Sequence, residues 1–278
     1  MLSILKTPDG LNLHVAHHAG PDDARGTVVL VHGLGEHGGR YAHVVQALLR
    51  WGWHVVTYDH RGHGRSDGRR GGLAEDDSLL CDLGQVVAAT RAEHVGPIVL
   101  LGHSMGGAVA ARYVAEGTLT DPQRWFHPVD ALVLSSPALD AGLSRAQLLQ
   151  LRLMGWVAPN LPVGNGLKPE WVSRDAGVVA AYVADPLVHD RITPRLVRFI
   201  VEAGEAVRCQ AASWNLPTLL MWAGSDRCVA PRGSEAFAAA APPALVTARP
   251  YPALYHEIFN EPERDQVLQC LGDWLAAR

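Results

Sequence analysis

The sequence IVLLGHSMGG at residues 98–107 decides the fold of this chain. Its apolar residues Ile98 to Leu101 are typical of a buried strand, and the small residues Gly106 to Ala111 suit a helix packed close to a sheet. Glycines two before and two after Ser104 allow a sharp turn that holds the serine in a strained conformation. The pattern therefore predicts a strand-turn-helix with the Ser104 hydroxyl as a nucleophile above the sheet, rather than an ordinary glycine-rich turn.

Length and composition favour a globular enzyme with one core and one insertion. The chain has 278 residues, of which 48% are hydrophobic and 19% are charged, so disorder is not its main state. A formal net charge of −4 gives no electrostatic reason to expect a nucleic-acid partner. The cysteines lack the spacing of a zinc site or of a disulfide framework, and we expect no metal: Cys81, Cys209, Cys228 and Cys270.

Targeting signals are not evident in the sequence. Met1 to Gly10 contains no basic segment followed by a long apolar core. No apolar run approaches the roughly 18 residues of a membrane span. We therefore expect a cytoplasmic protein.

Short apolar runs alternate with helical patterns along most of the chain. Residues 1–17 read as an edge hairpin whose strands join at Pro8-Asp9-Gly10, a typical turn tripeptide. The further predicted strands are Thr27–Val31, Trp53–Tyr58, Pro97–Leu101, Val129–Leu134, Leu216–Trp222 and Leu245–Tyr251. The predicted helices between them are Tyr41–Trp51, Ser78–His94, Met105–Glu116, Gly233–Ala241 and Glu263–Ala277. Strands and helices in alternation predict an α/β fold with a mostly parallel sheet flanked by helices.

The alternation stops between Pro137 and Trp214, which predicts an inserted helical cap. We expect a core formed by residues 1–139 and 213–278 and a cap over residues 140–212, where prolines 159, 162, 169, 186 and 194 break the chain into short pieces. The first cap helix, Ser144–Val157, has more apolar residues than one buried stripe requires. It is open whether this helix packs tightly over the core, roofs an apolar pocket or contacts a lipid interface.

A serine nucleophile needs a base and an orienting acid, and both are expected downstream of Ser104. The predicted strand ending at Trp222 leads into Ala223-Gly224-Ser225-Asp226, and Asp226 is the candidate acid. Capping the helix near Pro231 is its alternative use, and Asp190 and Asp273 are weaker rivals. His256 follows the last predicted strand and is the candidate base, because no other histidine lies beyond Asp226.

Two glycine-containing loops supply the candidate oxyanion donors. The backbone amide of Met105 lies at the start of the predicted helix, where the helix dipole also stabilises negative charge. The amide of Leu34, in the loop His32 to Tyr41, is the second candidate; this loop lacks the spacing of a nucleotide-binding motif. The polar loop Asp59 to Asp67 is better explained as structural than as a metal site at His60 and His63.

With these residues in place, the chain resembles the α/β-hydrolase superfamily, in particular its monoacylglycerol lipase and lysophospholipase group. The residues that carry this resemblance are His32 to His37 with Arg40-Tyr41, Asp59 to Gly68, Gly102 to Gly107, Gly224 to Arg227, and Tyr255-His256. The resemblance implies that Ser104, Asp226 and His256 form a triad and that Leu34 and Met105 give the oxyanion amides. It also implies that the cap residue Tyr182 binds glycerol hydroxyls, although packing within the cap is an equal alternative.

We therefore expect a serine carboxylic ester hydrolase that works through an acyl-enzyme and needs no cofactor. The expected substrates are monoacylglycerols or similar medium to long acyl esters. A lysophospholipase, a thioesterase or a broad-specificity carboxylesterase would use the same triad. The expected partner is a small acyl ester, with transient contact between the cap and a membrane as a further option.

Overall fold

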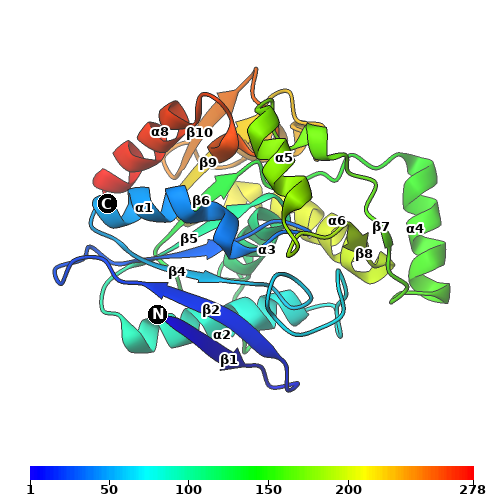
Figure 1. Cartoon of the computed structure of the whole chain (residues 1–278), viewed down its shortest axis with the longest axis horizontal. Helices are drawn as coiled ribbons and strands as arrows, with labels where there is room; N and C mark the ends of the chain where they lie inside the picture. The colour runs from blue at the N-terminus through cyan, green and yellow to red at the C-terminus, as the bar shows by residue number, and fades with distance from the viewer.

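An eight-stranded sheet forms the centre of the computed structural model, which describes all 278 residues (Figure 1). The strands lie in the spatial order β1-β2-β4-β3-β5-β6-β9-β10. Their bounds are β1 Leu2–Lys6, β2 Asn12–His18, β3 Thr27–Val31, β4 His54–Tyr58, β5 Ile98–His103, β6 Ala131–Ser135, β9 Thr218–Ala223 and β10 Val246–Tyr251. β2 is antiparallel to both of its neighbours and the other pairs are parallel. The predicted α/β fold and its edge hairpin are confirmed.

Helices cover both faces of the sheet. α1 (Ala42–Arg50) and α8 (Arg264–Ala276) pack on one face, and α2 (Ser78–Glu93), α3 (Ser104–Glu116) and α7 (Arg232–Ala240) pack on the other. β3 has an uninterrupted apolar sequence because both of its faces are buried. Val28 and Leu30 pack in the core on the side of α1 and α8, whereas Val29 and Val31 pack in the core on the side of α2, α3 and α7. A parallel strand that is buried on both faces has no polar face, so polar and apolar residues do not alternate along it.

The segment between β6 and β9 has its own helices and a small two-stranded sheet. Its elements are α4 Arg145–Val157, β7 Val163–Gly164, α5 Ala176–Ala184, β8 Arg191–Ile192 and α6 Pro194–Cys209. Four 3-10 helices complete the chain: η1 Gly38–Tyr41, η2 Pro169–Trp171, η3 Ala211–Ser213 and η4 Ile258–Asn260. The antiparallel β7–β8 pair was not predicted from the sequence.

One expectation for this segment is wrong, because α6 is not a short piece. Pro194 opens this helix of 16 residues instead of breaking the chain there. A proline fits the first turn, since the amide that it lacks has no partner within the helix. Thr193 caps the helix by accepting a hydrogen bond from the amide of Leu196 at 3.3 Å.

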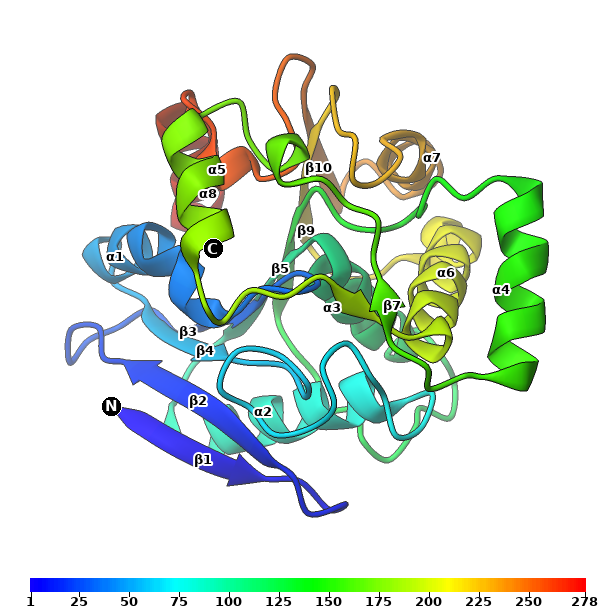
Figure 2. The ribbon, with the colours of Figure 1, turned by 45° about the vertical axis from the view of Figure 1, so that its right-hand side comes forward.

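Helix α4 lies at the margin of the molecule, beside α6 (Figure 2). None of its residues is buried. Four large apolar side chains are instead strongly exposed: Leu149, Leu153, Trp156 and Val157. Tight packing over the core, one of the three alternatives for this helix, is therefore wrong.

Candidate active site

Ser104 lies on a sharp turn between β5 and α3. Its φ of +54° lies in the left-handed region, which side-chain-bearing residues rarely adopt. The turn requires glycine nearby: a Cβ on Gly106 would stand 2.1 Å from the carbonyl oxygen of Val31, and one on Gly102 would stand 2.6 Å from that of Gly106. This close approach holds α3 against β3 and places the serine at the carboxyl end of the parallel strands.

A chain of two hydrogen bonds connects the three side chains predicted for the triad. Nε2 of His256 lies 2.8 Å from Oγ of Ser104, and Nδ1 of His256 lies 2.7 Å from Oδ2 of Asp226. His256 comes from the loop after β10, and Asp226 from the loop after β9. All three side chains are buried or nearly so. The structure thus brings together residues that are distant in sequence, in the order that base-assisted attack by a serine requires.

The other contacts of Asp226 orient its carboxylate. Oδ1 accepts hydrogen bonds from the amides of Cys228 at 2.7 Å and Val229 at 3.0 Å, which leaves Oδ2 for the imidazole. Helix α7 begins after Pro231 without any side-chain cap, so Asp226 does not cap it. The two rival carboxylates lie elsewhere: Asp190 contacts Arg191, and Asp273 accepts from Gln269 within α8.

Charge around His256 favours its protonated form. Burial lowers the pKa of His256, but the Asp226 carboxylate, with Glu257 and Glu36 farther away, more than offsets this, and the net pKa is raised. The ring of His103 lies 4.8 Å from that of His256 and hydrogen-bonds to Ser135 Oγ at 3.1 Å. Burial, and then the charge of His256, lowers the pKa of His103 to about 3, so His103 is neutral beside the base.

Leu34 and Met105, the residues with the predicted oxyanion amides, line the same cavity as Ser104. Met105 lies in the first turn of α3, whose amides have no partner within the helix. The amide of Leu34 makes no hydrogen bond in the structure. The preceding amide, that of Gly33, donates to Glu36 Oε1 at 2.6 Å, which fixes the loop. Two amides without partners, in residues that line the cavity at Ser104, remain the candidate donors for a negative oxygen.

An apolar cavity of about 160 Å³ opens at Ser104. It is lined by Leu34, Ser104, Met105, Ala138, Ala141, Leu143, Asn165, Leu167, Ile192, Val197, Ile200, Cys228 and Val229. Burial and the nearby charge of Asp226 raise the pKa of the Cys228 thiol well above its ordinary value. Cys228 is therefore a thiol in the cavity wall and not an activated nucleophile.

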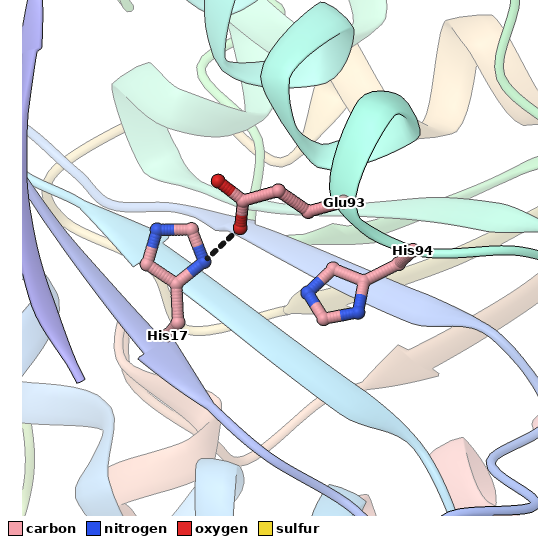
Figure 3. A group of neighbouring side chains, drawn as sticks. All are labelled: His17, Glu93 and His94. Atoms are coloured by element: carbon pink, nitrogen blue, oxygen red, sulfur yellow. Dashed lines mark ion pairs between the residues drawn. The ribbon is translucent and has the colours of Figure 1, made fainter.

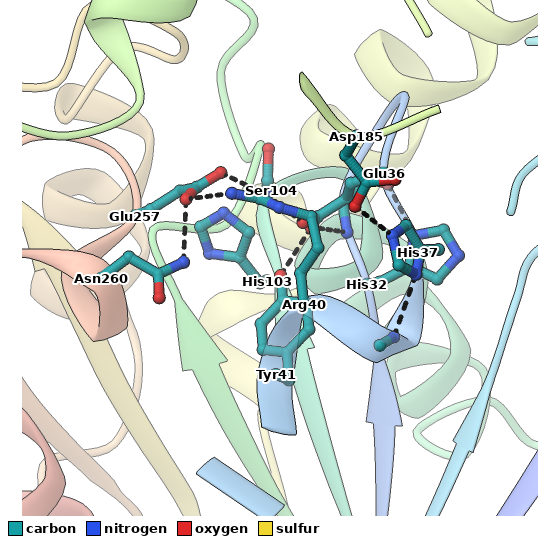
Figure 4. Close-up of polar contacts among 12 residues, drawn as sticks. His32, Glu36, His37, Arg40, Tyr41, His103, Ser104, Asp185, Glu257 and Asn260 are labelled. Carbon is teal, nitrogen blue, oxygen red and sulfur yellow. Dashed lines mark hydrogen bonds and ion pairs between the residues drawn. The ribbon is translucent and has the colours of Figure 1, made fainter. Parts of the chain in front are cut away.

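A buried ionic cluster joins the loop of Leu34 to the loop of His256 (Figure 4). Arg40 donates hydrogen bonds to Glu36 at 2.5 Å and, through both terminal nitrogens, to Glu257 at 2.6 and 2.8 Å. Tyr41 adds a hydrogen bond to Glu36 at 2.5 Å. Glu36, Arg40 and Tyr41 lie in the loop that the sequence analysis singled out, but Glu257 was not predicted as their partner.

Tyr182 lies on this cluster and not in the cavity wall. Its ring covers the guanidinium of Arg40, with 4.7 Å between the ring centre and Cζ. Three residues further on, Asp185 contacts Nε2 of His37 at 2.9 Å. These contacts attach α5 to the Leu34 loop.

Buried hydrogen bonds hold the loop from Asp59 to Asp67 in place. The Asp59 carboxylate accepts hydrogen bonds from the amides of Gly38 and Arg65, each at 2.9 Å, and Ser66 Oγ donates to the Asp59 carbonyl. His60 and His63 are buried, and burial holds the pKa of each well below its ordinary value.

The chain is similar to known lipases in sequence and in structure. A monoacylglycerol lipase from Mycolicibacterium smegmatis is 38% identical over 262 residues, which cover 92% of this chain and 90% of the relative. The crystal structure of a monoacylglycerol lipase from Paleococcus ferrophilus has a TM-score of 0.84 at 32% identity, covering 95% and 98% of the two chains. A phospholipase from Bacillus subtilis, YtpA, is 29% identical over 87% of this chain and 92% of its own.

The sheet order and the serine turn define the class of protein: an α/β-hydrolase that acts as a serine hydrolase. More narrowly, the chain belongs to the family described as serine aminopeptidase, S33, whose model matches residues 22–263. No helix of this chain is both long enough and apolar enough to pass through a lipid bilayer.

Proposed function

We propose that this chain hydrolyses monoacylglycerols through an acyl-enzyme formed on Ser104. Ser104 is the nucleophile, His256 the general base and acid, and Asp226 the carboxylate that orients and stabilises the imidazolium. The amides of Leu34 and Met105 bind the oxyanion. The hydrogen-bonded series Asp226–His256–Ser104 at the mouth of an apolar cavity is the observation that carries this proposal.

The reaction follows from the geometry. His256 Nε2 takes the proton of Ser104 while Oγ attacks the ester carbonyl, and the two amides stabilise the negative oxygen that develops. Collapse of the intermediate breaks the ester bond, and His256 returns the proton to the departing glycerol oxygen. Water activated by the same imidazole then attacks the acyl-enzyme, releasing the fatty acid and restoring Ser104.

The cavity and the relatives support an acyl substrate. The lining is mostly aliphatic, which suits a hydrocarbon chain. Both the M. smegmatis relative and the P. ferrophilus structure are described as monoacylglycerol lipases. Tyr182 is the proposed polar contact for the glycerol, and its place above Arg40 would put the hydroxyls beside the ionic cluster.

Residues 140–212 act, in our proposal, as a cap over the core of residues 1–139 and 213–278. Several residues of this segment line the cavity, among them Leu143, Leu167, Ile192 and Ile200. The exposed apolar side chains of α4 support transient contact of the cap with a lipid interface. If so, Trp156→Ser combined with Leu153→Ser would reduce sedimentation with phosphatidylglycerol vesicles, whereas turnover of a short water-soluble ester would be unchanged.

Lysophospholipids are the second candidate substrates, favoured by the similarity to the B. subtilis phospholipase. We also propose a cytoplasmic location, which the four free cysteines support because disulfides are rare in reducing compartments.

A substrate panel decides among these activities. Monoacylglycerols of graded acyl length, lysophosphatidylcholines, acyl thioesters, nitrophenyl esters and an aminoacyl arylamide would be compared by kcat/KM. The proposal predicts the highest kcat/KM for monoacylglycerols. It also predicts that Ser104→Ala turns over none of the substrates. A preference for the arylamide, as the peptidase description of the family would suggest, or for lysophospholipids would contradict it.

A further inference from the structure

His17, Glu93 and His94 gather at the edge of the sheet opposite Ser104. One nitrogen from each histidine and one carboxylate oxygen of Glu93 all lie within 4.8 Å of one another (Figure 3). We propose that these three side chains bind a divalent transition-metal ion, with Zn²⁺ as the best fit. Two imidazoles and one carboxylate are an established ligand set for zinc, and water would complete the tetrahedron.

The fold brings these residues together from two elements. His17 is the second-last residue of β2, where it pairs with Val56 in the middle of β4. Glu93 is the last residue of α2, and His94 follows it directly. The parallel strands begin at this edge and end at the edge that carries Ser104, so an ion bound here would not contact the reacting ester.

A buried nitrogen that lacks a hydrogen-bond partner is the strongest sign of a ligand. Nδ1 of His17 lies 3.1 Å from Glu93 Oε2, but it makes no aligned hydrogen bond to that oxygen or to any other group. The other ring nitrogen, Nε2, contacts Ser3 Oγ at 3.0 Å. This second contact leaves Nδ1 as the atom available to an ion and fixes the orientation of the ring, as outer contacts of metal-binding histidines commonly do.

Distances favour an ion of the size of zinc. Zinc binds imidazole nitrogen at about 2.0–2.1 Å and carboxylate oxygen at about 2.0–2.2 Å, so two ligand atoms roughly 3.1–3.5 Å apart can share one ion. The separation of His17 Nδ1 and Glu93 Oε2 falls in this range. A small cavity of about 130 Å³, lined in part by these two residues, adjoins the site.

A nitrogen of His94, within 4.8 Å of the other two ligand atoms, is the proposed third ligand, and coordination requires its ring to turn toward them. It is only half-buried, and its ring lies 4.6 Å from that of His54. His54 is itself held in place, because its Nδ1 accepts a hydrogen bond from the amide of Gly20 at 2.9 Å. The single negative charge of Glu93 partly neutralises a divalent ion, and the two histidines bind it as neutral ligands.

The test is a calorimetric titration of the full chain, without a tag, with Zn²⁺ at pH 7.5. The tag must be absent because the amino group of Met1 hydrogen-bonds to the carbonyl of His17 at 2.5 Å. Asp226, Cys228 and His256 form a second group that can hold a metal, so one further equivalent at the candidate active site is allowed. Glu93→Gln and His94→Ala are the test variants, and His18→Ala, on the other face of β2, is the matched control.

Wild type and His18→Ala are expected to bind one equivalent of Zn²⁺ at this site. The two test variants should bind that equivalent at least about ten-fold more weakly, because loss of even an outer contact of a metal ligand lowers metal affinity by about that factor. Electron paramagnetic resonance of the Cu²⁺ form should show one imidazole nitrogen fewer in His94→Ala than in wild type. Unchanged zinc affinity in both test variants, or no binding by wild type, would overturn the proposal and leave only a His17–Glu93 ion pair. Ester turnover should be the same in Glu93→Gln as in wild type, so this result is independent of the proposed function.

Discussion

Arg40 forms a two-pronged hydrogen bond with Glu257, the residue directly after His256. The same guanidinium bonds to Glu36, whose other oxygen accepts from the amide of Gly33. One buried cation therefore connects the loop that carries the proposed base with the loop that carries the proposed oxyanion donor. The position of the two loops relative to each other depends on this contact, because each loop supplies one of its partners.

Arg40→Gln is expected to lower the free energy of unfolding by about 3–5 kcal/mol, because it leaves two buried carboxylates without their cation. Ester hydrolysis should also fall. Arg91→Gln, which removes an exposed ion pair with Asp130, is the control and should cost no more than about 1 kcal/mol. Chemical denaturation measures the free energy of unfolding of both variants. Equal losses would mean that the buried cluster contributes no more to stability than the exposed ion pair.

Glycine at position 106 should be irreplaceable. A Cβ there overlaps the carbonyl oxygens of Val31 and His32 at 2.1 and 2.3 Å, so Gly106→Ala must push α3 away from β3. We expect a loss of about 3 kcal/mol or more, together with loss of activity as the Met105 amide moves. Gly155→Ala is the matched control: nothing lies within 4 Å of its Cβ in the exposed helix α4, and it should stabilise by up to about 1 kcal/mol. Thermal melting compares the two.

Activity should depend on pH through His256. The imidazole accepts the serine proton only when it is neutral, so kcat/KM is high above its pKa and falls as the pH drops through it. Because the surrounding carboxylates raise this pKa in spite of burial, the acid limb should have its midpoint above the ordinary value of 6.5. A profile of kcat/KM between pH 5 and 9 on a neutral ester measures it, and a midpoint below 6.5 would show that burial outweighs the carboxylates.

Asp226→Asn tests the acid. An asparagine can keep the two amide contacts of Oδ1, but it cannot stabilise the imidazolium and favours the wrong tautomer of His256. We expect kcat to fall by roughly 10³–10⁴-fold. Circular dichroism should show an unchanged fold. Loss of less than ten-fold would indicate that another group orients the imidazole.

The sheet and the candidate triad were predictable because they depend on local patterns. The strands are buried on both faces, so uninterrupted apolar runs such as Thr27–Val31 mark them directly. Asp226 and His256 each follow a predicted strand, and parallel strands bring such loops to one edge.

What could not be predicted depends on contacts between distant segments. Pro194 is an exception, because the Thr193 cap directly before it is a local helix-start pattern that the sequence analysis did not use. The exposure of α4 depends on which other elements pack against it. The apolar periodicity of α4 itself does not contain this information. Likewise, nothing near Arg40 in sequence indicates Glu257 as its partner.

The covalent chemistry at Ser104 is the central claim, and mass spectrometry after treatment with a fluorophosphonate tests it most directly. Wild type should gain one adduct, located on Ser104 in the peptide that contains Gly102 to Gly107. Ester turnover should fall in proportion to the labelled fraction. Ser104→Ala should gain none, and His256→Ala should react far more slowly. An adduct on another residue that abolishes turnover, or full turnover by Ser104→Ala, would contradict the account.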